Sequence, residues 1–128
     1  MEQLKFSTAV FERGLNVTVR LGDKWHKFLE ENSEDGKPVE VELATSEGNV
    51  IGKGAIEATE ELPFHHIAFL DTVLSLEHDT NCRNMSDLYN ALKRVYGDSF
   101  TANSNMTLVF FTVSQVNDES MWNEDSPF

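Results

Sequence analysis

Residues 106–113 read Met-Thr-Leu-Val-Phe-Phe-Thr-Val, and this stretch is the most informative one for the fold. Its apolar side chains occupy both the odd and the even positions of a period-two repeat, so a strand built from it has no polar face. Strands of this kind are buried on both faces of a sheet. We therefore predict that residues 106–113 form a central strand.

An amphipathic helix is predicted upstream of this strand, over residues 84–97. Asn84 suits the N-cap, with Asp87 three residues later in the capping-box position. Gly97 fits the left-handed residue that ends many helices. Apolar residues recur between these ends at i, i+3, i+4 and i+7, which predicts a stripe that packs on the sheet. The stripe consists of Leu88, Ala91, Leu92 and Val95.

A strand and a short helix are predicted near the N-terminus. Residues 17–21 alternate between apolar and polar side chains, which indicates a half-buried strand whose polar face carries Thr18 and Arg20. Asp23 can cap a helix that runs to residue 31. The apolar face of this helix comprises Trp25, Phe28 and Leu29.

The middle of the chain has the pattern of a hairpin. Residues 39–43 alternate as a one-sided strand, and residues 50–58 form the returning strand. Gly52 and Gly54 inside the returning strand predict a bulge or a close approach of another backbone. Residues 64–76 fit either a helix or a short helix followed by a strand.

This order of elements predicts an α+β domain over residues 1–114. A small mixed β-barrel with one or two flanking helices satisfies it. Residues 115–128 are acidic and lack periodicity, so we expect a flexible C-terminal tail there.

Composition limits the classes of partner. The 128 residues carry 10 Lys and Arg against 22 Asp and Glu, a formal net charge of −12. Binding to a nucleic-acid backbone depends on many phosphate contacts from cations, so any contact with nucleic acid must be local. No secretory or membrane-spanning pattern is visible, and Cys82 is the single cysteine. These features favour a cytoplasmic protein that has no membrane partner.

Several short patterns along the chain resemble the ASCH family, a branch of the PUA-like superfamily. They span roughly residues 10–114 and follow one another in the order typical of that family. The patterns are Gly14 followed by Thr18-Val19-Arg20; Gly36-Lys37-Pro38-Val39; Gly54-Ala55-Ile56 followed by Pro63 and Phe64; Val95-Tyr96-Gly97; and Val109-Phe110-Phe111. The resemblance implies a PUA-like barrel with a cleft that binds RNA or modified nucleosides.

Some small ASCH proteins hydrolyse N4-acetylcytidine with a lysine, a threonine and a glutamate. The resemblance places the threonine at Thr18. The lysine position falls on Leu15 or Asn16, and the glutamate position falls on Arg83. Leu15, Asn16 and Arg83 cannot replace the lysine and the glutamate as nucleophile or general base. The sequence therefore favours a non-catalytic binding module.

Cationic and aromatic residues near the predicted strand could form the binding site. Arg20 lies on its polar face, and Arg83 precedes the helix whose free amides attract anions. Such a set would offer a cationic fork for a phosphate or a base edge and a ring for stacking. The predicted ligand-binding residues are Thr18, Arg20, Lys24, Trp25 and Arg83.

The alternatives for this set are structural. Trp25 is also interpreted as a core residue packed on Phe28, and Arg20 as the partner of one of the many glutamates. Two other functions also fit the sequence. One is an amidohydrolase with a rearranged site, and the other is an acidic, phage-type inhibitor that captures a basic nucleic-acid-binding protein.

No pattern in the chain indicates a cofactor or a metal. The sequence has neither a Gly-x-x-x-x-Gly-Lys phosphate loop nor a Gly-x-Ser-x-Gly elbow. His65 and His66 with His78, Asp79 and Cys82 match no metal-ligand spacing, so we interpret them as surface residues.

Overall fold

The computed structural model describes residues 1–67 and 84–123. Five strands within these residues form one sheet in the order β1-β3-β4-β5-β2. The strands are β1 (Gln3–Phe6), β2 (Asn16–Leu21), β3 (Val39–Thr45), β4 (Val50–Pro63) and β5 (Asn105–Val116). The described helices are α1 (Lys24–Asn32), α2 (Phe64–Ile67) and α4 (Met85–Tyr96), with the 3-10 turns η1 (Gly97–Ser99) and η2 (Glu119–Met121).

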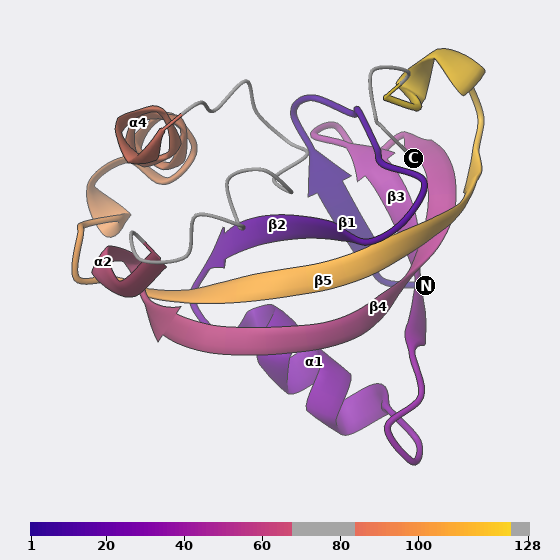
Figure 1. The fold of residues 1–128 in the computed structure, drawn as a ribbon, viewed down its shortest axis with the longest axis horizontal. Coiled ribbons are helices and arrows are strands. Elements are labelled where there is room, and N and C mark those ends of the chain that lie inside the picture. The colour runs from indigo at the N-terminus through magenta and orange to yellow at the C-terminus, as the bar shows by residue number, and fades with distance from the viewer. Residues whose placement is uncertain (68–83, 124–128) are drawn as a thin grey trace.

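The sheet curls into a half-barrel (Figure 1). β1 is parallel to β3, and the other strand pairs are antiparallel. The edge strands β1 and β2 approach each other across the curl, where the guanidinium carbon of Arg20 lies 5.0 Å from the ring centroid of Phe6. The α+β class and the barrel-like sheet expected from the sequence are therefore confirmed.

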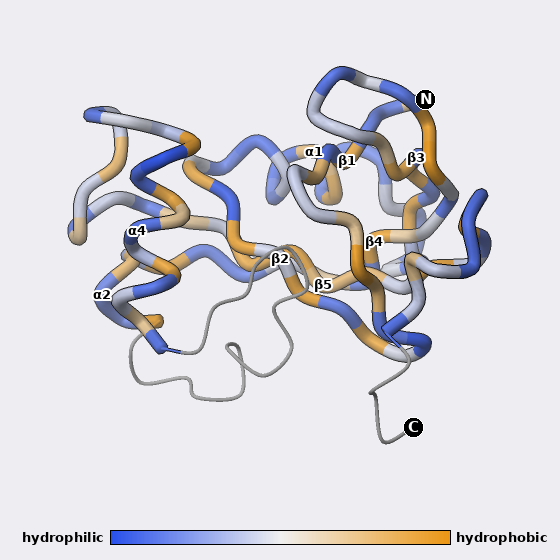
Figure 2. Tube along the Cα trace, turned by 90° about the horizontal axis from the view of Figure 1, so that it is seen from above, coloured by the Kyte–Doolittle hydropathy of each residue, from blue (hydrophilic) through white to orange (hydrophobic). Residues whose placement is uncertain are grey.

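β5 is an internal strand whose two faces support two separate cores, which confirms the prediction for residues 106–113. Hydrophobic residues, orange in Figure 2, run along β4 and β5. One core, here called the α1-side core, contains Leu4, Phe6, Phe11, Trp25, Val41, Leu43, Ile51, Ile56, Val109, Phe111, Val113 and Trp122. The other, the α4-side core, contains Val17, Val19, Phe64, Ile67, Leu88, Leu92, Phe100, Met106 and Leu108.

The glycines of β4 lie where another backbone comes close, as the sequence indicated. A Cβ atom on Gly52 would collide with the carbonyl oxygen of Gln115, and one on Gly54 would collide with that of Thr112. The β4–β5 register shifts beside Gly54, which marks an irregularity in the ladder. β4 continues to Pro63, beyond the expected end at residue 58, because its pairing with β5 continues to Asn105.

The two longer helices begin in different ways. The Asp87 amide donates to the Asn84 side chain at 2.9 Å, so Asn84 caps α4 as predicted, and Gly97 follows the helix with φ of 60°. Asp23 precedes α1 but makes no side-chain cap bond. Its carboxylate instead pairs with the Lys27 ammonium at 3.2 Å, so the expected cap is not formed.

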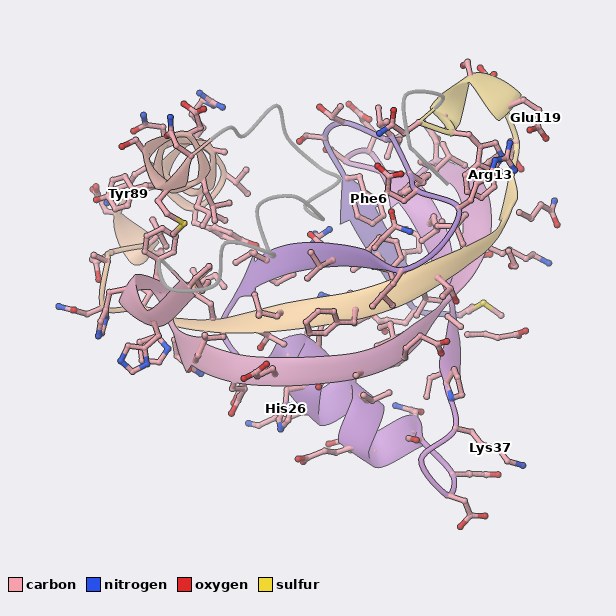
Figure 3. The ribbon with its side chains drawn as sticks, viewed as in Figure 1. Phe6, Arg13, His26, Lys37, Tyr89 and Glu119 are labelled. Atoms are coloured by element: carbon pink, nitrogen blue, oxygen red, sulfur yellow. The ribbon has the colours of Figure 1, made fainter. Side chains whose placement is uncertain are left out.

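α1 lies under the sheet, against β4 and β5 (Figure 1). Figure 3 shows His26 between α1 and β4, and its Nδ1 lies 2.8 Å from the Thr59 hydroxyl. Trp25 is buried, with Phe28 and Leu29 packed on the same core. This is the apolar helix face that the sequence predicted. Across the residues that the structure describes, no helix is long and apolar enough to span a membrane.

Residues 115–123 belong to the fold, which differs from the flexible tail expected there. β5 extends to Val116, and Trp122 is buried in the α1-side core. Phe11 and Trp122 form a parallel bridge. Arg13, near Glu119 in Figure 3, places its guanidinium carbon 4.6 Å from the Trp122 ring centroid. A single anchoring aromatic leaves no periodic signal in sequence, which explains the difference. Residues 124–128 lie outside the described residues.

Candidate functional site

A pocket of about 440 Å³ opens where the N-terminal segment, the end of β2 and the start of α1 meet. This volume lies within the range typical of small-molecule sites. Three of its lining residues are cationic and one is acidic, so the lining carries a net positive charge on a chain with a net charge of −12. The lining residues are Met1, Glu2, Gln3, Lys5, Arg20, Lys24 and Trp25.

Three of the five residues predicted from the sequence meet in this pocket: Arg20, Lys24 and Trp25. They converge because β2 ends at Leu21 and α1 starts at Lys24, after a tight turn in which Gly22 has φ of 83°. That turn brings the polar residue at the end of the strand beside the first turn of the helix.

Thr18 supports the pocket from below rather than lining it. Its side chain is 1% exposed, and its hydroxyl oxygen accepts a hydrogen bond from Arg20 Nε at 3.1 Å. The sequence predicted a polar face that carries Thr18 and Arg20. The curl of the sheet turns this face toward β1, where Phe6 lies beneath the guanidinium of Arg20.

Arg20 has no counter-ion within residues 1–67 and 84–123. The ion pairs found there are Lys24–Glu2, His26–Glu30 and Lys27–Asp23. One terminal nitrogen of Arg20, Nη2, is buried and makes no hydrogen bond. The alternative in which a glutamate pairs with Arg20 is therefore wrong for the described part of the chain. A buried guanidinium nitrogen without an acceptor is costly, and such an atom needs an explanation.

Lys24 holds the outer rim of the pocket. Its ammonium lies 3.1 Å from a carboxylate oxygen of Glu2 and 4.9 Å from the ring centroid of Trp25. The side chains of Lys24 and Glu2 are 66% and 41% exposed. An ion pair this exposed contributes little to stability, so it can open at small cost.

Trp25 is a core residue whose edge reaches the pocket. It is 6% exposed and packs edge-on against Phe28 at a centroid distance of 5.4 Å. With Phe28 on the ring and the Lys24 ammonium near it, Trp25 does not present a free face. The interpretation of Trp25 as a core residue packed on Phe28 is confirmed. That its ring stacks on a base stays a prediction.

The helix that was expected to flank the site lies on the other face of the sheet. α4 packs against Val17 and Val19, which alternate along β2 with Thr18 and Arg20. None of the pocket-lining residues comes from α4. Arg83, the fifth predicted site residue, lies outside the described residues.

Glu2, Gln3 and Lys5 complete the pocket wall and were not predicted from the sequence. Gln3 and Lys5 belong to the four-residue strand β1, and Glu2 directly precedes it; so short a strand leaves no clear pattern. Leu4 and Phe6 are buried while Lys5 is exposed, so a period-two alternation is present and could have placed Lys5 on the surface of an edge strand.

His65 and His66 lie in the short helix α2, not in a strand, with ring centroids 4.4 Å apart. His78, Asp79 and Cys82 fall outside the described residues. Within residues 1–67 and 84–123, no three His, Cys, Asp or Glu side chains gather closely enough to hold a metal ion.

No protein-family model matches this chain. Neither curated proteins nor solved structures show a significant match to it. The chemistry of the pocket is therefore the basis for assigning a function.

Proposed function

We propose that this chain is a PUA-like binding module of the ASCH type that holds a nucleoside of RNA, or a free modified nucleoside, in the pocket around Arg20. The observation that carries the proposal is the uncompensated Arg20 guanidinium in a positive pocket on an acidic chain. An anionic or acceptor-bearing ligand in the pocket would supply the counter-charge that Arg20 lacks among the described residues.

The size and charge of the pocket favour a small contact over a groove that tracks a long backbone. A volume of about 440 Å³ suits one nucleoside. Sequence-specific recognition of RNA depends on unstacked bases bound in such sites. With a net charge of −12, the surface as a whole repels nucleic acid, so the interaction must be concentrated in the pocket.

The environment of Asn16 favours binding over hydrolysis. By the resemblance to hydrolytic ASCH proteins, their lysine would fall on Leu15 or Asn16. Asn16 is fully buried, and its amide bonds the backbone of Glu12 in both directions, accepting at 2.9 Å and donating at 3.1 Å. A side chain used in this way holds the preceding loop and is not available for proton transfer.

NMR titration of the labelled full chain tests the proposal, with modified nucleosides and short single-stranded RNA added at low salt. We expect shifts at Lys5, Arg20, Lys24 and the Trp25 indole, and their loss in Arg20→Ala. Arg13→Ala is the matched control, because it removes the same charge from a guanidinium that contacts Trp122. Equal binding by wild type and Arg20→Ala would refute the proposal. Conversion of N4-acetylcytidine would favour the hydrolase instead.

A pull-down from lysate separates this proposal from the acidic-inhibitor alternative. Recovery of a basic nucleic-acid-binding protein that is released by high salt, with no change in Arg20→Ala, would favour the inhibitor. A module that acts through its pocket should depend on Arg20 in every assay.

A further inference from the structure

We infer that the ligand of this pocket carries a phosphomonoester, and that the Glu2 carboxylate occupies the position of that phosphate in the free protein. The inference rests on the proposed nucleoside-binding function and adds the class of ligand. It begins from the Glu2–Lys24 contact of 3.1 Å at the rim of a pocket that also contains Lys5 and Arg20.

The charges in the pocket are not balanced in the free protein. Glu2 supplies one negative charge to three cations, and among the described residues it pairs with Lys24 alone. Lys5 makes no ion pair within the described part of the chain, and neither does Arg20. A phosphomonoester carries a charge of about −1.5 to −2 at neutral pH, whereas a phosphodiester or a carboxylate carries about −1. The monoester therefore matches the cations of this pocket better than an internal RNA phosphate does.

The donors around the pocket also suit a phosphate. Arg20 uses Nε on Thr18, and its terminal Nη2 has no partner. Lysine ammonium groups bind phosphate as compact point charges and can reorient to meet it. Lys24 and Trp25 are the first two residues of α1, and the Asp23 side chain leaves that helix end uncapped. The positive end of the helix dipole adds to the potential there.

Glu2 can leave at small cost. The Glu2–Lys24 pair is largely exposed, and exposed pairs are worth little. A phosphate that displaces Glu2 would contact Lys24 while also neutralising Lys5 and Arg20. Glu2 thus acts as a weak internal competitor, which lowers the affinity of the pocket for anions without closing it.

Isothermal titration calorimetry at fixed ionic strength tests this inference on the full chain. The probes are a nucleoside, its 5′-monophosphate, inorganic phosphate, and one RNA oligomer with and without a 5′-phosphate. The variants are Glu2→Gln and the control Glu31→Gln, which makes the same charge change at an exposed site that does not line the pocket. The oligomer distinguishes an RNA end from a free mononucleotide.

We expect the monophosphate to bind at least about tenfold more tightly than the nucleoside. Glu2→Gln should raise the affinity for the monophosphate by about two- to fivefold and leave that for the nucleoside unchanged. Glu31→Gln should change neither by a comparable factor. Inorganic phosphate should bind more weakly than the monophosphate.

Two results would overturn the inference while the proposed function stands. In one, the nucleoside binds as tightly as its monophosphate. In the other, Glu2→Gln raises both affinities equally or neither. If inorganic phosphate binds as tightly as the monophosphate, the site is for phosphate alone, and the nucleotide assignment fails. If no nucleoside, nucleotide or RNA binds, the proposed function fails as well.

Discussion

The two faces of β5 differ in the hydrogen-bond acceptors that surround a cation beside the hydrophobic core. On the α4 side, the Lys93 ammonium donates to the Phe100 carbonyl at 2.6 Å and lies 3.4 Å from that of Gly97. On the α1 side, Arg20 rests on Phe6 with one nitrogen buried and unbonded. Both cations lie beside hydrophobic residues. The Lys93 ammonium has two backbone carbonyls near it, whereas Arg20 bonds the Thr18 hydroxyl through Nε and has no acceptor for its buried Nη2.

The comparison distinguishes a cation that stabilises the fold from a cation that we propose binds a ligand. The α4 side also supplies an acceptor at the edge of the sheet, where the Leu21 amide donates to the Tyr96 hydroxyl at 3.3 Å. Proteins pair nearly all of their buried polar groups, so an exception needs an explanation, and our proposal gives one. In that proposal the α4 side supports the structure, and the α1 side presents the binding site.

We expect the largest decrease in the free energy of unfolding from a substitution that disturbs both faces of the sheet. Gly54→Ala should lower the free energy of unfolding by about 2–3 kcal/mol, because its Cβ would collide with the Thr112 carbonyl on β5. Gly14→Ala is the control, since no atom lies within 4 Å of a Cβ built there. Chemical denaturation measures both. Equal stability of the two variants would contradict the close approach of β4 and β5.

A smaller effect should distinguish one face from the other. Phe6→Leu and Phe100→Leu each remove ring volume from a buried site, and each should cost about 1–2 kcal/mol of unfolding free energy. Only Phe6→Leu should also weaken ligand binding, because Phe6 lies under the Arg20 guanidinium. Calorimetric titration of the two folded variants checks this. Weaker binding in Phe100→Leu would show that the faces are not independent.

The smallest effect concerns the C-terminal end of the α1 side. Asp118 accepts hydrogen bonds from the Ser120 amide and hydroxyl, which lower the pKa of its carboxyl from 3.8. Because the folded pKa is the lower one, this stabilisation is complete above the unfolded value of 3.8 and is lost as the pH falls through the folded pKa.

Thermal unfolding of Asp118→Ala against wild type measures that contribution. The wild type should unfold at a slightly higher temperature at neutral pH, and the difference should shrink as the pH falls below 3.8. A difference that stays constant or grows in acid would show that the carboxylate does not stabilise η2.

The parts of the fold that the sequence predicted well are those specified by local chemistry. Asn84 and Gly97 mark the two ends of α4, and residues 106–113 are apolar on both faces. A glycine inside a strand is itself a local sign of a close backbone approach, and Gly54 lies at one. In each case a nearby residue type carries the information, so no knowledge of distant neighbours is needed.

The site was predicted only in part, because its geometry is set by the curl of the sheet. The alternation in β2 placed Thr18 and Arg20 on one face, but it could not show that this face turns inward toward β1. Glu2 and Lys5 join the pocket through the parallel pairing of β1 with β3. That pairing joins segments about forty residues apart, and no local pattern records it.

The central claim is that Arg20 is retained for a ligand and not for the fold, and the unfolding free energy of Arg20→Met beside Lys93→Met tests it most directly. Arg20→Met loses the bond to Thr18 but removes a buried unpaired nitrogen, so we predict a change within about 1 kcal/mol. Lys93→Met leaves the Phe100 carbonyl without its donor and should cost about 2 kcal/mol. A loss in Arg20→Met as large as that in Lys93→Met would contradict the account.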